Sequence, residues 1–161
     1  MAEKTERELA QVNVAENRKA FHDYHILDTW EAGVVLLGTE VKSIRAGHVN
    51  LRGAYARIEK NEAYVFDVDI QPYERASHEQ HVPKRKRRLL LHRREIEQLF
   101  VESNVSGRTL VPLRLYWKSG RVKVEIGVGK GKLAGDKRSD VKKREESREA
   151  DRAAASFNRH R

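Results

Sequence analysis

The densest group of charged side chains lies in residues 84–94, which carry seven Lys or Arg and no Asp or Glu. Like charges held this close repel one another, so a polyanion is the natural partner of such a run. Clustered Lys and Arg bind phosphates and release condensed counterions, which is the chemistry of nucleic-acid recognition. Composition leaves nuclear localisation open as a second interpretation of the same residues.

Metal and nucleotide chemistry have weaker support. His22 and His25, like His78 and His81, are separated by two residues, but the chain has no cysteine and no evident third ligand for zinc. The glycine-rich residues 127–132 lack the spacing and the Ser or Thr of a Walker A motif. That segment favours a flexible strand end, with a backbone contact to an RNA phosphate as the alternative. We therefore predict neither a metal nor a cofactor.

A magnesium-dependent nuclease could use the carboxylates of Asp23, Glu31 and Glu40. Carboxylates scattered over a strand and a helix are more often surface or structural residues, and no Ser–His–Asp arrangement is recognisable. We therefore predict a binding protein and no enzyme. The nuclease remains the alternative that incubation with RNA and magnesium would test.

Short strands must position these residues. Apolar, β-branched and aromatic residues predict strands over 21–37 (one strand, or two broken near Gly33), 55–58 and 64–70, and a hairpin of 111–117 and 122–128. Residues 88–91 fit a strand or the entry to a helix. Short helices are expected over 40–45, with Thr39 as N-cap, and over 92–103.

About six short strands with one alternating apolar face predict a mainly β fold, a small antiparallel barrel, because closure removes exposed edges. The 161 residues hold enough apolar material for one modest core. The charged N-terminus does not resemble a signal peptide, and no apolar run reaches membrane-spanning length. We expect a soluble cytoplasmic protein with a loose N-terminal arm over 1–11 and a barrel over 12–129.

The positive charge is unevenly distributed. The formal net charge is +9, yet residues 1–83 carry 10 Lys or Arg and 14 Asp or Glu, whereas residues 84–161 carry 23 and 10. Residues 130–161 form a basic tail with too few apolar residues for a core, so we expect it to be disordered in the free protein. Its sequence still encodes a helix with a basic stripe, which phosphates would stabilise. An ordinary charged tail is the alternative.

Seven short motifs, in order along residues 12–138, resemble the SsrA-binding protein family, also called small protein B. They are Asn17-Arg18-Lys19-Ala20, the segment 31–33, the helix segment 38–47, Arg87-Arg88-Leu89-Leu90-Leu91, Leu115-Tyr116-Trp117, the segment 122–126, and Lys130-Gly131-Lys132 with Asp136-Lys137-Arg138.

The resemblance implies an OB-like barrel that binds the tRNA-like domain of transfer-messenger RNA (tmRNA), promotes its alanylation and delivers it to stalled ribosomes in trans-translation. It implies a monomer whose partners are tmRNA and the small-subunit decoding region and mRNA channel of the ribosome. Alanyl-tRNA synthetase and elongation factor Tu are implied as indirect partners, and no membrane is. A general OB-fold RNA-binding protein without tmRNA specificity is the alternative.

The family's RNA-binding surface, carried over by motif, comprises Asn17, Lys19, Glu31, Glu40, Val41, Lys42, Arg45 and Leu90. Lys42 and Arg45 would contact phosphates, and Asn17 would read a base edge or a 2′-hydroxyl. Glu31 would accept hydrogen bonds from RNA or orient a neighbouring cation. Leu90 would press on an unstacked base or fill the core, and its residue type alone favours the core.

The family's tail, which enters the empty mRNA channel and becomes helical there, corresponds to Lys130, Lys132, Asp136, Lys137, Arg138, Arg144 and Arg148. Leu133 and Gly135 depart from the pattern, which often has a lysine and a histidine or aromatic residue at those positions. A charge and a stacking contact on ribosomal RNA would then be missing, and Phe157 or nearby cations would have to compensate.

Overall fold

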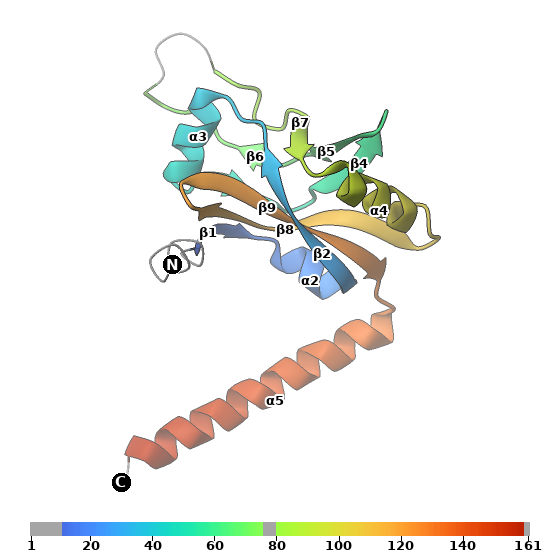
Figure 1. The fold of residues 1–161 in the computed structure, drawn as a ribbon. Coiled ribbons are helices and arrows are strands. Elements are labelled where there is room, and N and C mark those ends of the chain that lie inside the picture. Colours follow the sequence, from blue (N-terminus) through green and yellow to red (C-terminus); the bar gives the residue numbers. More distant parts are fainter. Residues whose placement is uncertain (1–10, 76–79, 160–161) are drawn as a thin grey trace, which may run out of the picture.

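The computed structural model describes residues 11–75 and 80–159, and its centre is a closed ring of six strands (Figure 1). Around the ring the order is β8–β4–β5–β7–β2–β9, and β9 pairs back with β8, every pair being antiparallel. The bounds are β2 Tyr24–Val34, β4 Tyr55–Glu59, β5 Glu62–Phe66, β7 Arg87–Leu90, β8 Arg108–Lys118 and β9 Arg121–Gly131. The prediction of a six-stranded antiparallel barrel is confirmed.

The remaining strands lie outside the ring. β1 (Gln11–Glu16) pairs with the C-terminal half of β8, from Arg114 to Lys118. β3 (Val49–Asn50) pairs with β6 (Asp69–Ile70) in a separate small sheet. The helices are α2 (Arg18–Asp23), α3 (Gly38–Arg45), α4 (Arg93–Ser103) and α5 (Ala134–Arg159). None of the described helices is long and apolar enough to span a lipid bilayer.

Two long strands close the barrel. β8 and β9 form a hairpin whose turn residues, Ser119 and Gly120, have φ angles of 52° and 74°, the left-handed conformation that tight hairpins require. The register shifts between Pro112 and Arg114, and such an irregularity bends a strand. β8 can therefore pair with β9 along its length and still reach β4 through Leu110.

The core fills this ring. Leu115, Val124, Ile126 and Val128 of the hairpin are buried, and they pack with inward residues of the other strands and with Ile44 of α3. A smaller cluster of Val111, Leu113 and Ala20 lies beneath α2. The alternation predicted over 122–128 is therefore confirmed. The alternation predicted over 111–117 is interrupted by the register shift, so that Val111 and Leu113 pack with Ala20 of α2 while Leu115 packs in the barrel core.

Three local predictions were wrong. Residues 21–23 belong to α2 instead of a strand, because Asn17 caps that helix and starts it. α3 begins at Gly38, and Thr39 bonds to His81 instead of capping it. The predicted strand 64–70 breaks at Asp67, whose φ is 61°. The predicted arm 1–11 lies outside the described residues except for Gln11, which begins β1.

The helix that the tail sequence encodes is present, since residues 134–159 form one helix that projects from the barrel (Figure 1). The tail contributes nothing to a core, as its composition predicts, because residues 141–157 are all exposed. Ala, Glu, Lys and Arg favour a helix by intrinsic propensity, and Asp136 in the first turn complements the helix dipole. The predicted boundary also shifts, because β9 runs through Gly131.

Candidate nucleic-acid interface

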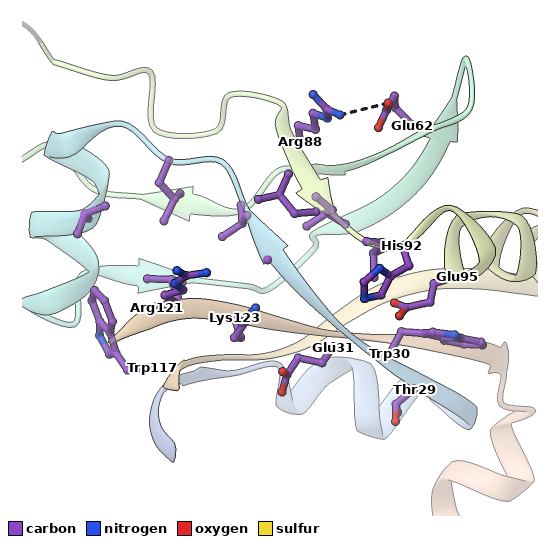
Figure 2. A pocket seen from close by; sticks show the side chains of 18 of the residues that line it. Thr29, Trp30, Glu31, Glu62, Arg88, His92, Glu95, Trp117, Arg121 and Lys123 are labelled. Carbon is purple, nitrogen blue, oxygen red and sulfur yellow. Dashed lines mark hydrogen bonds and ion pairs between the residues drawn. The ribbon is translucent and has the colours of Figure 1, made fainter. Parts of the chain in front are cut away.

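A broad open groove crosses strands β2, β7 and β9 on one side of the barrel (Figure 2). Its volume of about 1140 Å³ is larger than one small ligand would fill. Trp30 and Glu31 come from β2, Arg88 and Leu90 from β7, Trp117 from β8, and Arg121 and Lys123 from β9. Of the residues predicted for the RNA-binding surface, the groove brings together Glu31, Val41 and Leu90.

Leu90 is exposed in this groove, so the core interpretation that its residue type alone favours is wrong, and its placement on the predicted RNA-binding surface remains open to test. β7 pairs with β2 through Leu89 and Leu90, and the alternation of the strand sends Leu89 into the core and leaves Leu90 52% exposed. A Cβ on the facing Gly33 would come within 3.2 Å of the Leu90 Cβ. Glycine at that position therefore lets the two strands approach and presents Leu90 to the solvent.

Glu31 has two partners from β8, which lies on the far side of β9 from β2. Its Oε2 accepts hydrogen bonds from the Tyr116 hydroxyl at 2.5 Å and from Lys118 Nζ at 3.2 Å. Partial burial raises the pKa of Glu31, but these two bonds outweigh it and hold the pKa below its ordinary value of 4.5. Burial, together with the bond to Glu31, raises the pKa of Tyr116. Glu31 is therefore a fixed carboxylate that orients Lys118.

Asn17 has a structural role that the sequence did not reveal. It is 4% exposed, accepts a hydrogen bond from the Ala20 amide, and donates to the Leu51 and Pro112 carbonyls at 3.2 and 3.0 Å. Its side-chain amide and carbonyl groups all bond inside the protein and support the fold, and its role in reading a base stays a prediction. Lys19 is exposed on α2, outside the residues that line the groove.

Glu40 is completely buried and cannot touch an RNA directly. Its carboxylate accepts hydrogen bonds from Arg87 Nε at 2.7 Å and from Arg85. Burial lowers the pKa of Arg87, and the adjacent Glu40 opposes that shift. This ion pair ties α3 to the segment that leads into β7, and so it sets the position of Leu90 from a distance.

Three other residues of α3, Val41, Lys42 and Arg45, lie at the surface, whereas Ser43 and Ile44 are buried. Val41 lines the groove, Lys42 Nζ lies 5.4 Å above the Tyr73 ring, and the Arg45 guanidinium lies 5.3 Å above the ring of Trp117. Because Trp117 itself lines the groove, Arg45 adds positive charge at its edge.

The metal alternatives gain no support. Glu40 is neutralised by arginines, Glu31 by Lys118, and His22 Nδ1 lies 3.0 Å from Asp23. His81 is held between Thr39 and the Ile70 carbonyl, and His78 lies outside the described residues. Within residues 11–75 and 80–159, no three His, Asp or Glu side chains gather in a way that could hold an ion.

The glycine-rich segment 127–132 is not a flexible strand end, because its first part is packed within β9. A Cβ on Gly127 would lie 2.7 Å from Leu113, and one on Gly129 would lie 2.9 Å from Tyr24. Glycine is therefore needed here for the close approach of neighbouring side chains, and Lys130 pairs with His25 of β2 in the sheet.

Ion pairs fix the start of α5 against α2 and β2. Lys132 is largely buried, donates to the Phe21 carbonyl at 3.2 Å and pairs with Asp140. Lys137 Nζ lies 3.3 Å from Asp23, and Asp136 lies 3.3 Å from His25 Nε2. Arg138, Arg144 and Arg148 are exposed. The predicted tail residues thus divide into an internally paired group and an exposed basic group.

Several residues of the groove were missed as site residues. They are Trp30, Arg88, Trp117, Arg121 and Lys123. Lys123 had a usable signal, since it alternates with the inward Val122 and Val124 and so had to point outward. Arg88 lay within the basic run 84–94, although the run itself did not show that Arg87 turns inward and Arg88 outward.

A small closed antiparallel barrel with a groove lined by tryptophans and cations defines an OB-like nucleic-acid-binding protein. The profile of the SmpB protein family matches residues 14–156, and the chain belongs to that family. An SsrA-binding protein of Roseiflexus castenholzii is 55% identical over 148 residues, covering 91% of this chain and 94% of the relative. The SsrA-binding protein of Carboxydothermus hydrogenoformans is 53% identical over 140 residues, covering 87% and 94%.

One solved relative extends this likeness to structure. It comes from a structure described as "tmRNA-SmpB: a journey to the center of the bacterial ribosome". The two chains are 49% identical and superpose with a TM-score of 0.64, over 74% of this chain and 85% of the solved one.

Proposed function

We propose that this protein binds the tRNA-like domain of tmRNA through the groove and delivers it to stalled ribosomes for trans-translation. The observation that carries the proposal is the likeness to the solved relative, whose description names tmRNA and the bacterial ribosome. The groove supplies the chemistry, because Leu90, Trp30 and Trp117 offer apolar contacts to bases while Arg88, Arg121 and Lys123 offer contacts to phosphates.

The proposal assigns a second role to α5. Its exposed Arg138, Arg144 and Arg148 suit the phosphate-lined mRNA channel of the small subunit, near the decoding region. The protein acts in the bacterial cytoplasm as a monomer that binds and positions RNA, without a catalytic step of its own. In this role the protein also promotes the alanylation of tmRNA by alanyl-tRNA synthetase, and it binds the same RNA as elongation factor Tu.

Replacing Leu90 by alanine tests the groove without changing its charge. We expect affinity for the tRNA-like domain to fall about fivefold, which is about 1 kcal/mol, the low end for a contact with one base. The dependence of affinity on salt should not change, because no phosphate contact is lost. Fluorescence anisotropy with labelled RNA would measure both quantities.

Val101→Ala is the matched control, since Val101 is a similarly exposed apolar residue on α4 at 64% exposure. It should leave affinity unchanged. Equal affinities of the Leu90→Ala variant and the wild type would remove the groove from the binding site.

A further inference from the structure

A second surface on the outside of the barrel combines stacked aromatic rings with cations. We call it the β4–β5 face and define it as Tyr55, Arg57, Tyr64, Phe66 and Lys86. Tyr55 and Phe66 are direct cross-strand partners, and their rings stack with centroids 5.1 Å apart and planes 9° apart. These side chains are all at least partly exposed, and on β5 they alternate with the buried Ala63 and Val65.

The cations of this face lie over its rings. The Arg57 guanidinium is 5.7 Å from the Tyr55 centroid and 5.6 Å from that of Phe66. Lys86 Nζ is 4.0 Å from the centroid of Tyr64 and 5.6 Å from that of Phe66. A cation above an aromatic ring is attracted by the negative π-face, so both cations are held at the level of the rings.

Two glutamates accompany the cations. Glu59 pairs with Lys86 and lies 3.8 Å from Arg57, and Glu62 lies 3.2 Å from Arg88 on the neighbouring strand. Arg57 nevertheless remains 60% exposed and Lys86 44%. The acids therefore orient the cations and leave them accessible to a ligand.

We propose that the β4–β5 face binds single-stranded RNA, with unpaired bases stacking on its rings or on the guanidinium plane of Arg57, and phosphates contacting Lys86. A ligand with flat π-faces and a negative backbone matches rings interleaved with cations. The rings are covered by cations instead of forming one apolar patch, which fits a polyanion better than the apolar surface of a protein partner.

The position of the face supports the same ligand. Arg88 and Glu62 line the groove, and β7 places Arg88 beside Tyr64 across the strand pair. One RNA could therefore continue from the groove over β7 onto the β4–β5 face. The inference goes beyond the proposed function, since it requires no preference for tmRNA.

The test uses the full chain and an oligouridylate of about 12 nucleotides, within the site sizes of OB folds, that carries the photoreactive base 4-thiouridine. We expect the Tyr55→Leu/Phe66→Leu double variant to bind it about tenfold more weakly than the wild type. In the wild type, cross-links should map by mass spectrometry to Tyr64 or Phe66. Leucine is apolar and large enough to keep covering the outer face of β4 and β5. Circular dichroism with thermal unfolding would verify that the variant is folded.

Phe100→Leu is the matched control, because Phe100 is an aromatic residue 50% exposed on α4, away from this face. It should bind the oligouridylate as the wild type does. Unchanged affinity of the folded double variant would overturn the proposal, as would cross-links confined to the groove. A Leu90→Ala variant with lowered affinity for the tRNA-like domain and unchanged cross-links at Tyr64 or Phe66 would support RNA binding by the β4–β5 face independently of the groove.

Discussion

Replacing Glu40 by glutamine is expected to lower the free energy of unfolding by about 3–5 kcal/mol, because it leaves a buried arginine without its counter-charge. Glu40 is 0% exposed and Arg87 is 1% exposed. Arg87 also donates to the Val68 carbonyl at 2.7 Å and to the Pro83 carbonyl at 3.0 Å, so its guanidinium cannot move out to the solvent without breaking these bonds. Urea unfolding at neutral pH, followed by circular dichroism, would measure the loss.

Glu62→Gln is the matched control. Glu62 also pairs with an arginine, Arg88, but both side chains are exposed, at 37% and 51%. An exposed pair contributes little, so we expect this change to lower stability by less than about 1 kcal/mol. If Glu40→Gln cost no more than Glu62→Gln, the buried pair would not have the structural role assigned to it.

A second variant separates charge from packing. Glu40→Leu combined with Arg87→Met replaces both members of the pair by apolar side chains, and we expect it to recover much of the stability lost in Glu40→Gln. The same comparison bears on RNA binding. Because Glu40 acts through the segment leading to Leu90, we expect affinity for the tRNA-like domain to follow the recovery of the fold.

Ending the chain after Leu133 is expected to abolish peptide tagging on stalled ribosomes while leaving affinity for the isolated tRNA-like domain within about twofold. The truncation has to lie beyond β9, since Lys130 and Gly131 pair with His25 and Tyr24 in the barrel. It removes all of α5 and its exposed cations, and it leaves every residue of the groove in place. The small change in affinity reflects the loss of long-range attraction by the basic helix.

Tagging would be measured in a reconstituted translation system programmed with a message that lacks a stop codon, and affinity by anisotropy. A matched variant, Arg144→Ala/Arg148→Ala, keeps the helix and removes two of its exposed cations. We expect it to tag at an intermediate level. Full tagging by the truncated chain would contradict the role proposed for α5.

The barrel could be predicted because its longest strands are encoded by patterns within short stretches of sequence. The hairpin of β8 and β9 shows period-2 alternation and a turn that glycine permits, and both features are visible in the sequence. The run Leu89-Leu90-Leu91 has no alternation, so only the pairing of β7 with β2 decides that Leu89 faces the core and Leu90 the groove. The exposure of Leu90 could therefore not be read from its neighbours.

The roles of Asn17 and Glu40 depend on residues distant in the sequence. Asn17 bonds to Leu51 and Pro112, and Glu40 pairs with Arg85 and Arg87, more than 30 residues away in every case. A motif identifies these residues as important, but it does not distinguish contact with RNA from support of the fold. The helix α5 is the opposite case, because it depends on local propensity and not on a core, and the sequence therefore indicates it directly.

Recognition of a folded RNA is tested most directly by titrating the full chain with the tRNA-like domain of tmRNA and with an unstructured RNA of equal length, each at two salt concentrations. We predict tighter binding of the folded domain and a preference that persists at the higher salt, because Leu90 and the tryptophans add contacts that salt does not screen. Equal affinities that fall together as salt rises would mean that electrostatic attraction alone accounts for binding, and would contradict the proposed function.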